Sequence, residues 1–174
     1  MKAILLLVVL LIRAFAAEAC SCVSGNDSEN QRIAAAYQQD ALVFVGRVTG
    51  VETIVTTDTV QVADTGPMEQ RIRLIRHESL RYTFTVSRRF KGVLNESKVQ
   101  VFTESQSASC GRAFKVGAAY LVHAFQVREK GSLTGGPPIP VTPYFATSSC
   151  NRGQGLRNVP RSELRQLKKL AQVG

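Results

Sequence analysis

The four cysteines are the feature that most constrains this fold. Cys20 and Cys22 flank a single residue, whereas Cys110 and Cys150 lie far along the chain. If the chain is exported, an even number of cysteines predicts two disulfides. A bond between Cys20 and Cys22 would close a strained ring, so the other two pairings are favoured, and both tie the N-terminal cysteines to distant segments. In the chain-entropy model, the disulfide that closes each such loop adds about 4 to 5 kcal/mol to the free energy of unfolding. The N-terminus, which would normally fray, also becomes rigid.

The N-terminus has the pattern of an export signal. An apolar run, Ala3–Ile12, is too short to cross a bilayer as a helix and is followed by an Ala-Glu-Ala cleavage site at 17–19. We therefore expect residues 1–19 to be removed and residues 20–174 to form one secreted domain, or a periplasmic or cell-surface one in a bacterium. Cleavage there makes Cys20 the first residue of the mature chain.

Two other uses of these cysteines fit the sequence less well. Paired zinc knuckles need closely spaced cysteine pairs, which the positions of Cys110 and Cys150 do not supply. We therefore expect no metal site of the protein's own and no cofactor. Acylation of Cys20, as in a bacterial lipoprotein, is disfavoured because Ala17 and Glu18 differ from the leucine and small residue usual before such a site.

The chain is basic, with 22 Lys and Arg against 13 Asp and Glu and a formal net charge of +9. Such a charge favours an anionic partner, for example an anionic polysaccharide or cell-surface polymer. Nucleic acid is a less suitable partner because an exported protein seldom meets it. After the signal, no apolar run is long enough to span a membrane.

In much of the mature chain, apolar and polar residues alternate as they do in short strands, and a helix is predicted near each end. One helix is predicted over 28–39, capped by Ser28, and a C-terminal helix with a leucine stripe over about 161–171. Strands are predicted over 41–49, 81–90, 98–103, 118–127 and 143–149. Gly46 inside the first strand indicates a bulge or bend. This pattern favours a mainly β fold, a five-stranded OB-type barrel with short flanking helices.

Two further segments connect these strands. In residues 50–79, apolar or β-branched residues alternate with polar ones on both sides of a turn signal at 64–67. This pattern predicts a long hairpin that protrudes from the body. Its arginines, Arg71, Arg73 and Arg76, either solubilise a strand face or contact an anionic partner. Residues 131–142, rich in Gly and Pro, are predicted to form a loop.

Several motifs resemble those of the tissue inhibitors of metalloproteinases, in the family's order. They are Cys20-Ser21-Cys22-Val23, Phe44-Val45-Gly46-Arg47-Val48, Arg89-Phe90-Lys91-Gly92, Ser107-Ala108-Ser109-Cys110-Gly111, Gly117 with Tyr120-Leu121-Val122, and Thr147-Ser148-Ser149-Cys150. The Cys-x-Cys directly after a cleavage site is the specific part of this resemblance. It implies an OB-fold of the netrin-like type, in a single-domain form because the family's third inhibitory-domain disulfide and its cysteine-rich C-terminal domain have no counterpart here.

The resemblance also implies pairings and roles. It implies disulfides Cys20–Cys110 and Cys22–Cys150, and chelation of a target protease's catalytic zinc by the α-amine and carbonyl of Cys20. Ser21 would point at the pocket just past the scissile bond. The other target contacts it implies are Cys22, Val23, Ala108 and Ser109.

We therefore expect a monomeric, secreted metalloprotease inhibitor, with a zinc metalloprotease as its partner. The alternative is a netrin-like extracellular binding module whose basic surface takes anionic polysaccharide or cell-surface ligands. An enzyme is not expected: the two histidines, His77 and His123, show no Ser/His/Asp arrangement, and His123 lies in an apolar strand typical of a core histidine. Two glycosylation sequons begin at Asn26 and Asn95.

Overall fold

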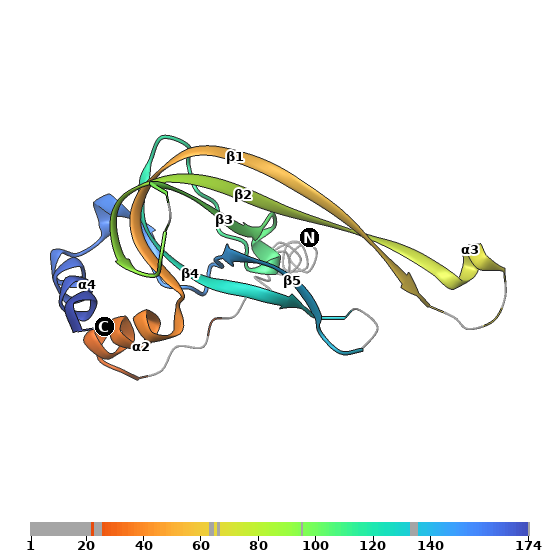
Figure 1. Ribbon diagram of the computed structural model, residues 1–174, viewed down its shortest axis with the longest axis horizontal. Coiled ribbons are helices and arrows are strands. Elements are labelled where there is room, and N and C mark those ends of the chain that lie inside the picture. Colours follow the sequence, from red (N-terminus) through yellow and green to blue (C-terminus); the bar gives the residue numbers. More distant parts are fainter. Residues whose placement is uncertain are drawn as a thin grey trace, which may run out of the picture.

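The computed structural model (Figure 1) describes residues 22, 26–62, 65, 67–94, 96–132 and 136–173. The predicted signal segment 1–19 and Asn95 lie outside these residues, whereas Asn26 is exposed. The helices are α2 (Glu29–Gln39), α3 (Met68–Arg71) and α4 (Arg161–Val173), with 3-10 turns η1 (Ser107–Ser109) and η2 (Leu156–Asn158). The strands are β1 (Leu42–Gln61), β2 (Ile72–Lys91), β3 (Lys98–Glu104), β4 (Ala119–Lys130), β5 (Ile139–Ala146) and β6 (Gly153–Gly155).

Five strands form a ring. Their order is β1-β2-β3-β5-β4, and β1 pairs with β4 as well as with β2, which closes the ring. The pairs are antiparallel except for β3 with β5, and the short β6 pairs with the beginning of β4. The predicted mainly β architecture is confirmed, although β6 was not expected because three residues of Gly-Gln-Gly give no strand pattern.

Gly46 lies where β1 approaches β2 too closely for a side chain to fit. The β1–β2 register shifts between Val45 and Gly46, which is the predicted bulge. A Cβ at Gly46 would lie 2.9 Å from the Phe44 ring and 3.0 Å from the carbonyl oxygen of Thr85. Only glycine permits this close approach of β1 to β2.

Two apolar cores lie on opposite faces of β1, as its doubly apolar pattern predicts. Phe44 points into the ring, where Phe84 meets it edge to face and Phe114 in turn meets Phe84 edge to face. Val43 points the other way, into a cluster covered by the two terminal helices. The ring therefore has one core inside it and another under α2 and α4.

The two long helices lie side by side against one part of the ring (Figure 1). Ser28 caps α2 in a reciprocal capping box with Gln31. The hydroxyl of Tyr37 donates to the carbonyl of Phe90, which fixes α2 to the end of β2. Both helices confirm the sequence prediction, and α4 continues beyond its predicted end to Val173.

Beyond the ring, β1 and β2 run on together as a two-stranded ribbon that projects from the body and carries α3 at its end (Figure 1). The pairing of β1 with β4 ends at Arg47, and that of β2 with β3 begins at Ser79. We call residues 50–61 and 72–79 the outer hairpin. The predicted hairpin is thus present, but its arms continue the ring strands instead of forming separate ones.

The segment before Cys150 differs from the prediction. β5 begins at Ile139, inside the predicted loop 131–142, and ends at Ala146, short of residue 149. Pro140 pairs with Glu129 of β4, and among the described residues no strand pairs with the other edge of β5 at this position. A proline is tolerated at such an edge position because it lacks an amide hydrogen. In the described part of the chain, no helix is long and apolar enough to cross a membrane.

Candidate functional site

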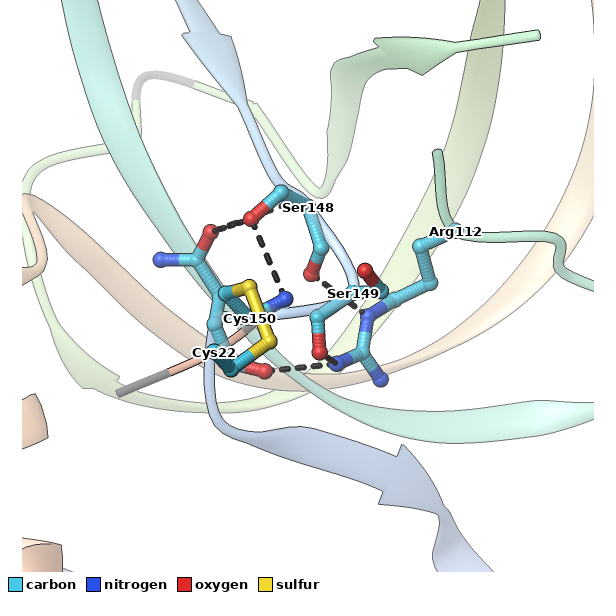
Figure 2. Close-up of a disulfide and its surroundings, with 6 residues drawn as sticks. Cys22, Arg112, Ser148, Ser149 and Cys150 are labelled. Carbon is cyan, nitrogen blue, oxygen red and sulfur yellow. Dashed lines mark hydrogen bonds between the residues drawn. A yellow bond between two sulfur atoms is a disulfide. The ribbon is translucent and has the colours of Figure 1, made fainter. Parts of the chain in front are cut away.

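A disulfide joins Cys22 to Cys150, just after the end of β5 (Figure 2). The S–S distance is 2.06 Å and the two Cα atoms are 5.3 Å apart. The bond closes a loop with a sequence separation of 128 residues. It is the pairing that the family resemblance implies for these two cysteines, and it fixes an N-terminal residue to the ring.

Cys110 lies close to this bond, at the end of the η1 turn. It is disulfide-bonded as well, and its expected partner, Cys20, lies outside the described residues. The backbone turns sharply here, since Cys110 has a φ of 59°. A Cβ on Gly111 would lie 2.2 Å from the carbonyl oxygen of Glu104, so the next position requires glycine. The amide of Ser149 donates to the carbonyl of Cys110 over 2.8 Å, which joins the two cysteine-bearing segments directly.

A single guanidinium holds the segment that carries Cys150. Arg112 Nε donates to the carbonyl of Ser148 over 2.9 Å, and Nη2 donates to those of Ser149 and Asn151 over 3.1 and 2.5 Å (Figure 2). Nη1 donates to the carbonyl of Gly153 over 2.7 Å. Burial lowers the pKa of Arg112 from its ordinary value, but arginine still stays protonated at neutral pH. The chain from 148 to 153 is therefore wrapped around a fixed cation.

A chain of hydrogen-bonded polar side chains, which ends in the buried Asp40 and His123, also supports this segment. The side-chain oxygen of Asn151 accepts from the amide and the hydroxyl of Ser148, each over 2.9 Å. Its Nδ2 donates to Asp40 Oδ1 over 3.0 Å, and Asp40 Oδ2 lies 2.8 Å from His123 Nδ1. His123 is fully buried, so the prediction of a core histidine is confirmed. Its other ring nitrogen has no hydrogen-bond partner among the described residues.

The predicted target-contact residues divide into two groups. Ala108 and Ser109 are exposed on η1, and Cys22 is exposed beside Cys150. Cys20, Ser21 and Val23 lie outside the described residues. We call Cys22, residues 107–110 and residues 148–150 the cysteine edge. The Cys22–Cys150 bond and the hydrogen bond from Ser149 to Cys110 bring these described segments together.

A groove runs from the cysteine edge to the root of the outer hairpin. It is a cavity of about 490 Å³, and residues that line it include Ser109, Ser148, Tyr144, Phe102 and His77. The ring of Tyr144 packs against that of Phe102 in a tilted arrangement, with ring centroids 4.9 Å apart. Burial, and then the charge of Glu104, raise the pKa of Tyr144, so its hydroxyl remains a neutral hydrogen-bonding group at physiological pH. A partner seated on the cysteine edge would meet this aromatic wall.

Sequence reasoning missed Arg112, Asp40 and Asn151, which position the cysteine edge. No motif marks them, since Arg112 binds backbone carbonyls, which every residue has. Within the described residues, no three His, Cys, Asp or Glu side chains gather as a metal site would require. The Nε2 atom of His77 lies 3.5 Å from Oδ2 of Asp58 on the exposed hairpin. This pair is distinct from the buried pair of His123 and Asp40.

The chain matches no known protein-family model, and none of the curated proteins compared with it matches either.

Proposed function

We propose that the mature protein is a secreted inhibitor of zinc metalloproteases of the tissue-inhibitor type, in which Cys20 is the first residue and binds the protease's catalytic zinc. The observation that carries this proposal is the Cys22–Cys150 disulfide. It fixes the chain immediately after the proposed first residue to a rigid edge of the ring. A free terminus would have to be ordered on binding, whereas a preorganised one avoids much of that cost.

The chemistry of an N-terminal residue suits this role. An α-amine has a pKa near 8, so its nitrogen can offer a lone pair near neutral pH. Together with the carbonyl oxygen of the same residue it closes a five-membered chelate on a metal ion. Catalytic zinc in a metalloprotease keeps one position open for water or substrate. Cys20 would displace that water and block the site without being cleaved.

The neighbouring residues support an extended contact with the protease. Ala108 and Ser109 are exposed beside the cysteine edge, next to the aromatic groove with Tyr144. Ser21 would enter the pocket just past the scissile bond, and Val23 would extend the contact. The strand order β1-β2-β3-β5-β4, with its single parallel pair, supports an OB-fold of the netrin-like type as the scaffold.

The proposal is tested by changing the N-terminus alone. The secreted form spanning residues 20–174 should inhibit a panel of zinc metalloproteases tightly and reversibly. The same form with one alanine placed before Cys20, or with its α-amine acetylated, should lose inhibition, because neither can form the chelate. One alanine added after Gly174 is the matched control and should inhibit like the parent.

Two further measurements make the outcome decisive. Thermal melting and the intact mass of each form should show the same fold and the loss of four hydrogens expected for two disulfides. Inhibition that survives the added alanine would rule out chelation by Cys20. An intact mass that contains acyl chains on Cys20 would show a lipoprotein instead.

A further inference from the structure

A second cavity lies where β4 begins, at a different place on the ring from the cysteine edge. Its volume is about 810 Å³. It is bordered by β1, by the loop that enters β4, and by η2 after β6, through Arg47, residues 115–120 and residues 155–158. The lining includes three cationic side chains, those of Arg47, Lys115 and Arg157, and none of the described residues that line it is acidic.

The frame of this cavity is held by its own hydrogen bonds. Arg47 Nη1 donates to the carbonyl of Gly117, which anchors the guanidinium at the rim. The backbone amide of Lys115 donates to the hydroxyl of Tyr120 over 2.9 Å. Gly117 takes a φ of 85°, the left-handed conformation that lets the loop turn back toward β1. The loop therefore presents its cations from an ordered backbone.

Some arginines elsewhere in the described residues are paired with carboxylates, whereas the three cations of the cavity are not. Arg152 is matched by Glu29 and Glu163, and Arg81 by Glu52. By contrast, Arg47, Lys115 and Arg157 form no ion pair with any described residue. Like charges gathered around a concave surface reinforce one another and attract anions.

We propose that this cavity binds a short segment of an anionic sugar chain, through sulfate or carboxylate groups held by Arg47, Lys115 and Arg157. The hollow is many times larger than an ordered water, whose share of liquid volume is about 30 Å³, so it suits an organic ligand better than a single inorganic anion. The side chains of Leu156 and Tyr120 offer apolar contact for sugar ring faces, and Asn158 offers hydrogen bonds to hydroxyl groups.

This site is separate from the cysteine edge. None of the described members of the cysteine edge lines this cavity, and the cavity shares no lining residue with the groove beside that edge. Binding of a sugar chain in the cavity therefore uses other residues than binding of a protease at the cysteine edge. The proposal does not rest on inhibition by Cys20.

The test compares two triple variants of the secreted form that lose the same charge. R47Q/K115Q/R157Q removes the cations of the cavity, and R165Q/K168Q/K169Q removes three exposed cations from α4. Calorimetric titration with a heparin tetrasaccharide should show that the parent binds it and that the binding weakens with salt. Relative to the parent, the affinity should fall by about tenfold or more in the cavity variant and by about twofold or less in the control. An equal loss in both variants would overturn the proposal in favour of diffuse attraction.

Two further arms complete the test. Because Arg47 also anchors the loop, K115Q/R157Q should show most of the loss with an unchanged melting temperature. The tetrasaccharide should shift the amide NMR signals of Gly117 and Gly155 and leave those of α4 unchanged. An oligogalacturonate compared with the sulfated tetrasaccharide shows whether carboxylate or sulfate is preferred. No binding of either sugar, or tighter binding of an oligonucleotide of equal charge, would overturn the assignment.

Discussion

The cysteine edge and the outer hairpin both lie beyond the closed part of the ring, yet they are held in different ways. At the cysteine edge a disulfide, the Arg112 guanidinium and the side chain of Asn151 all act on a few residues. Apart from its root, where Ser79 pairs with β3, the outer hairpin is held by the pairing of its own two strands, and its ion pairs, such as Arg76 with Glu78, join largely exposed side chains. A two-stranded ribbon without further packing is only marginally stable.

This difference indicates where the fold concentrates its rigidity. Local stability follows buried contacts and cross-links, so the hairpin should open at much lower free energy than the edge. Chelation of a metal by backbone atoms needs fixed geometry, which the edge provides. A long ribbon suits adjustable contact with a partner. Changes at the edge should therefore alter the free energy of unfolding more than changes in the hairpin.

The largest effect is expected from the disulfide at the cysteine edge. Replacing both partners, C22S/C150S, removes a cross-link across 128 residues, and the chain-entropy model gives a loss of about 4 to 5 kcal/mol in the free energy of unfolding. Urea denaturation of parent and variant measures it. A loss below about 1 kcal/mol would mean that the cross-link contributes little and that other contacts hold the edge.

The second effect is expected from Arg112. Arg112→Lys keeps the charge but cannot reach the carbonyls of Ser148, Asn151 and Gly153 together, so some of them lose their donors. We expect a loss of about 2 to 3 kcal/mol in the free energy of unfolding. The matched control, Arg89→Lys on an exposed part of β2, should stay within about 0.5 kcal/mol. Equal losses in the two variants would show that Arg112 does not act through its position.

A smaller, pH-dependent effect is expected from Glu29, which anchors the same segment through Arg152. Hydrogen bonding to Arg152 lowers the pKa of Glu29 below its ordinary value of 4.5. A carboxylate whose pKa is lowered by folding adds stability that is present above its unfolded pKa and lost as pH falls through its folded pKa. Glu29→Gln should thus destabilise slightly at pH 7 and leave stability unchanged near pH 2. The side chain is half exposed, so the effect is small; thermal melts from pH 7 to pH 2 measure it.

Much of the ring could be predicted from the sequence because its signals are local. Ser28 marks the start of α2, alternating residues mark the ring strands, and Gly46 marks the bulge in β1. The helix over 161–171 follows from its leucine spacing alone. The Cys22–Cys150 pairing was different, since the residues by themselves left two pairings open and only the family resemblance chose between them.

The support of the cysteine edge could not be predicted, for physical reasons. Asp40 and His123 are far apart in sequence and meet only because Leu42 pairs with Ala124 between β1 and β4. The clamp of Arg112 uses backbone carbonyls, which carry no sequence signal. The start of β5 was missed because prolines argue against a strand unless one knows that its other edge is unpaired at that point.

The smallest effect is expected from the outer hairpin itself. Deleting residues 57–76 and joining Thr56 to His77, which face each other in the ladder, through Asn-Gly supplies a tight hairpin turn. Most side chains removed are exposed or partly so, and the deletion leaves both core clusters intact. The free energy of unfolding of the body should therefore change by less than about 1 kcal/mol. A loss as large as that of C22S/C150S would erase the contrast, because the ribbon would then be part of the cooperative core. A small loss together with altered preference among target proteases would instead mark the hairpin as an adjustable contact beside a rigid cysteine edge.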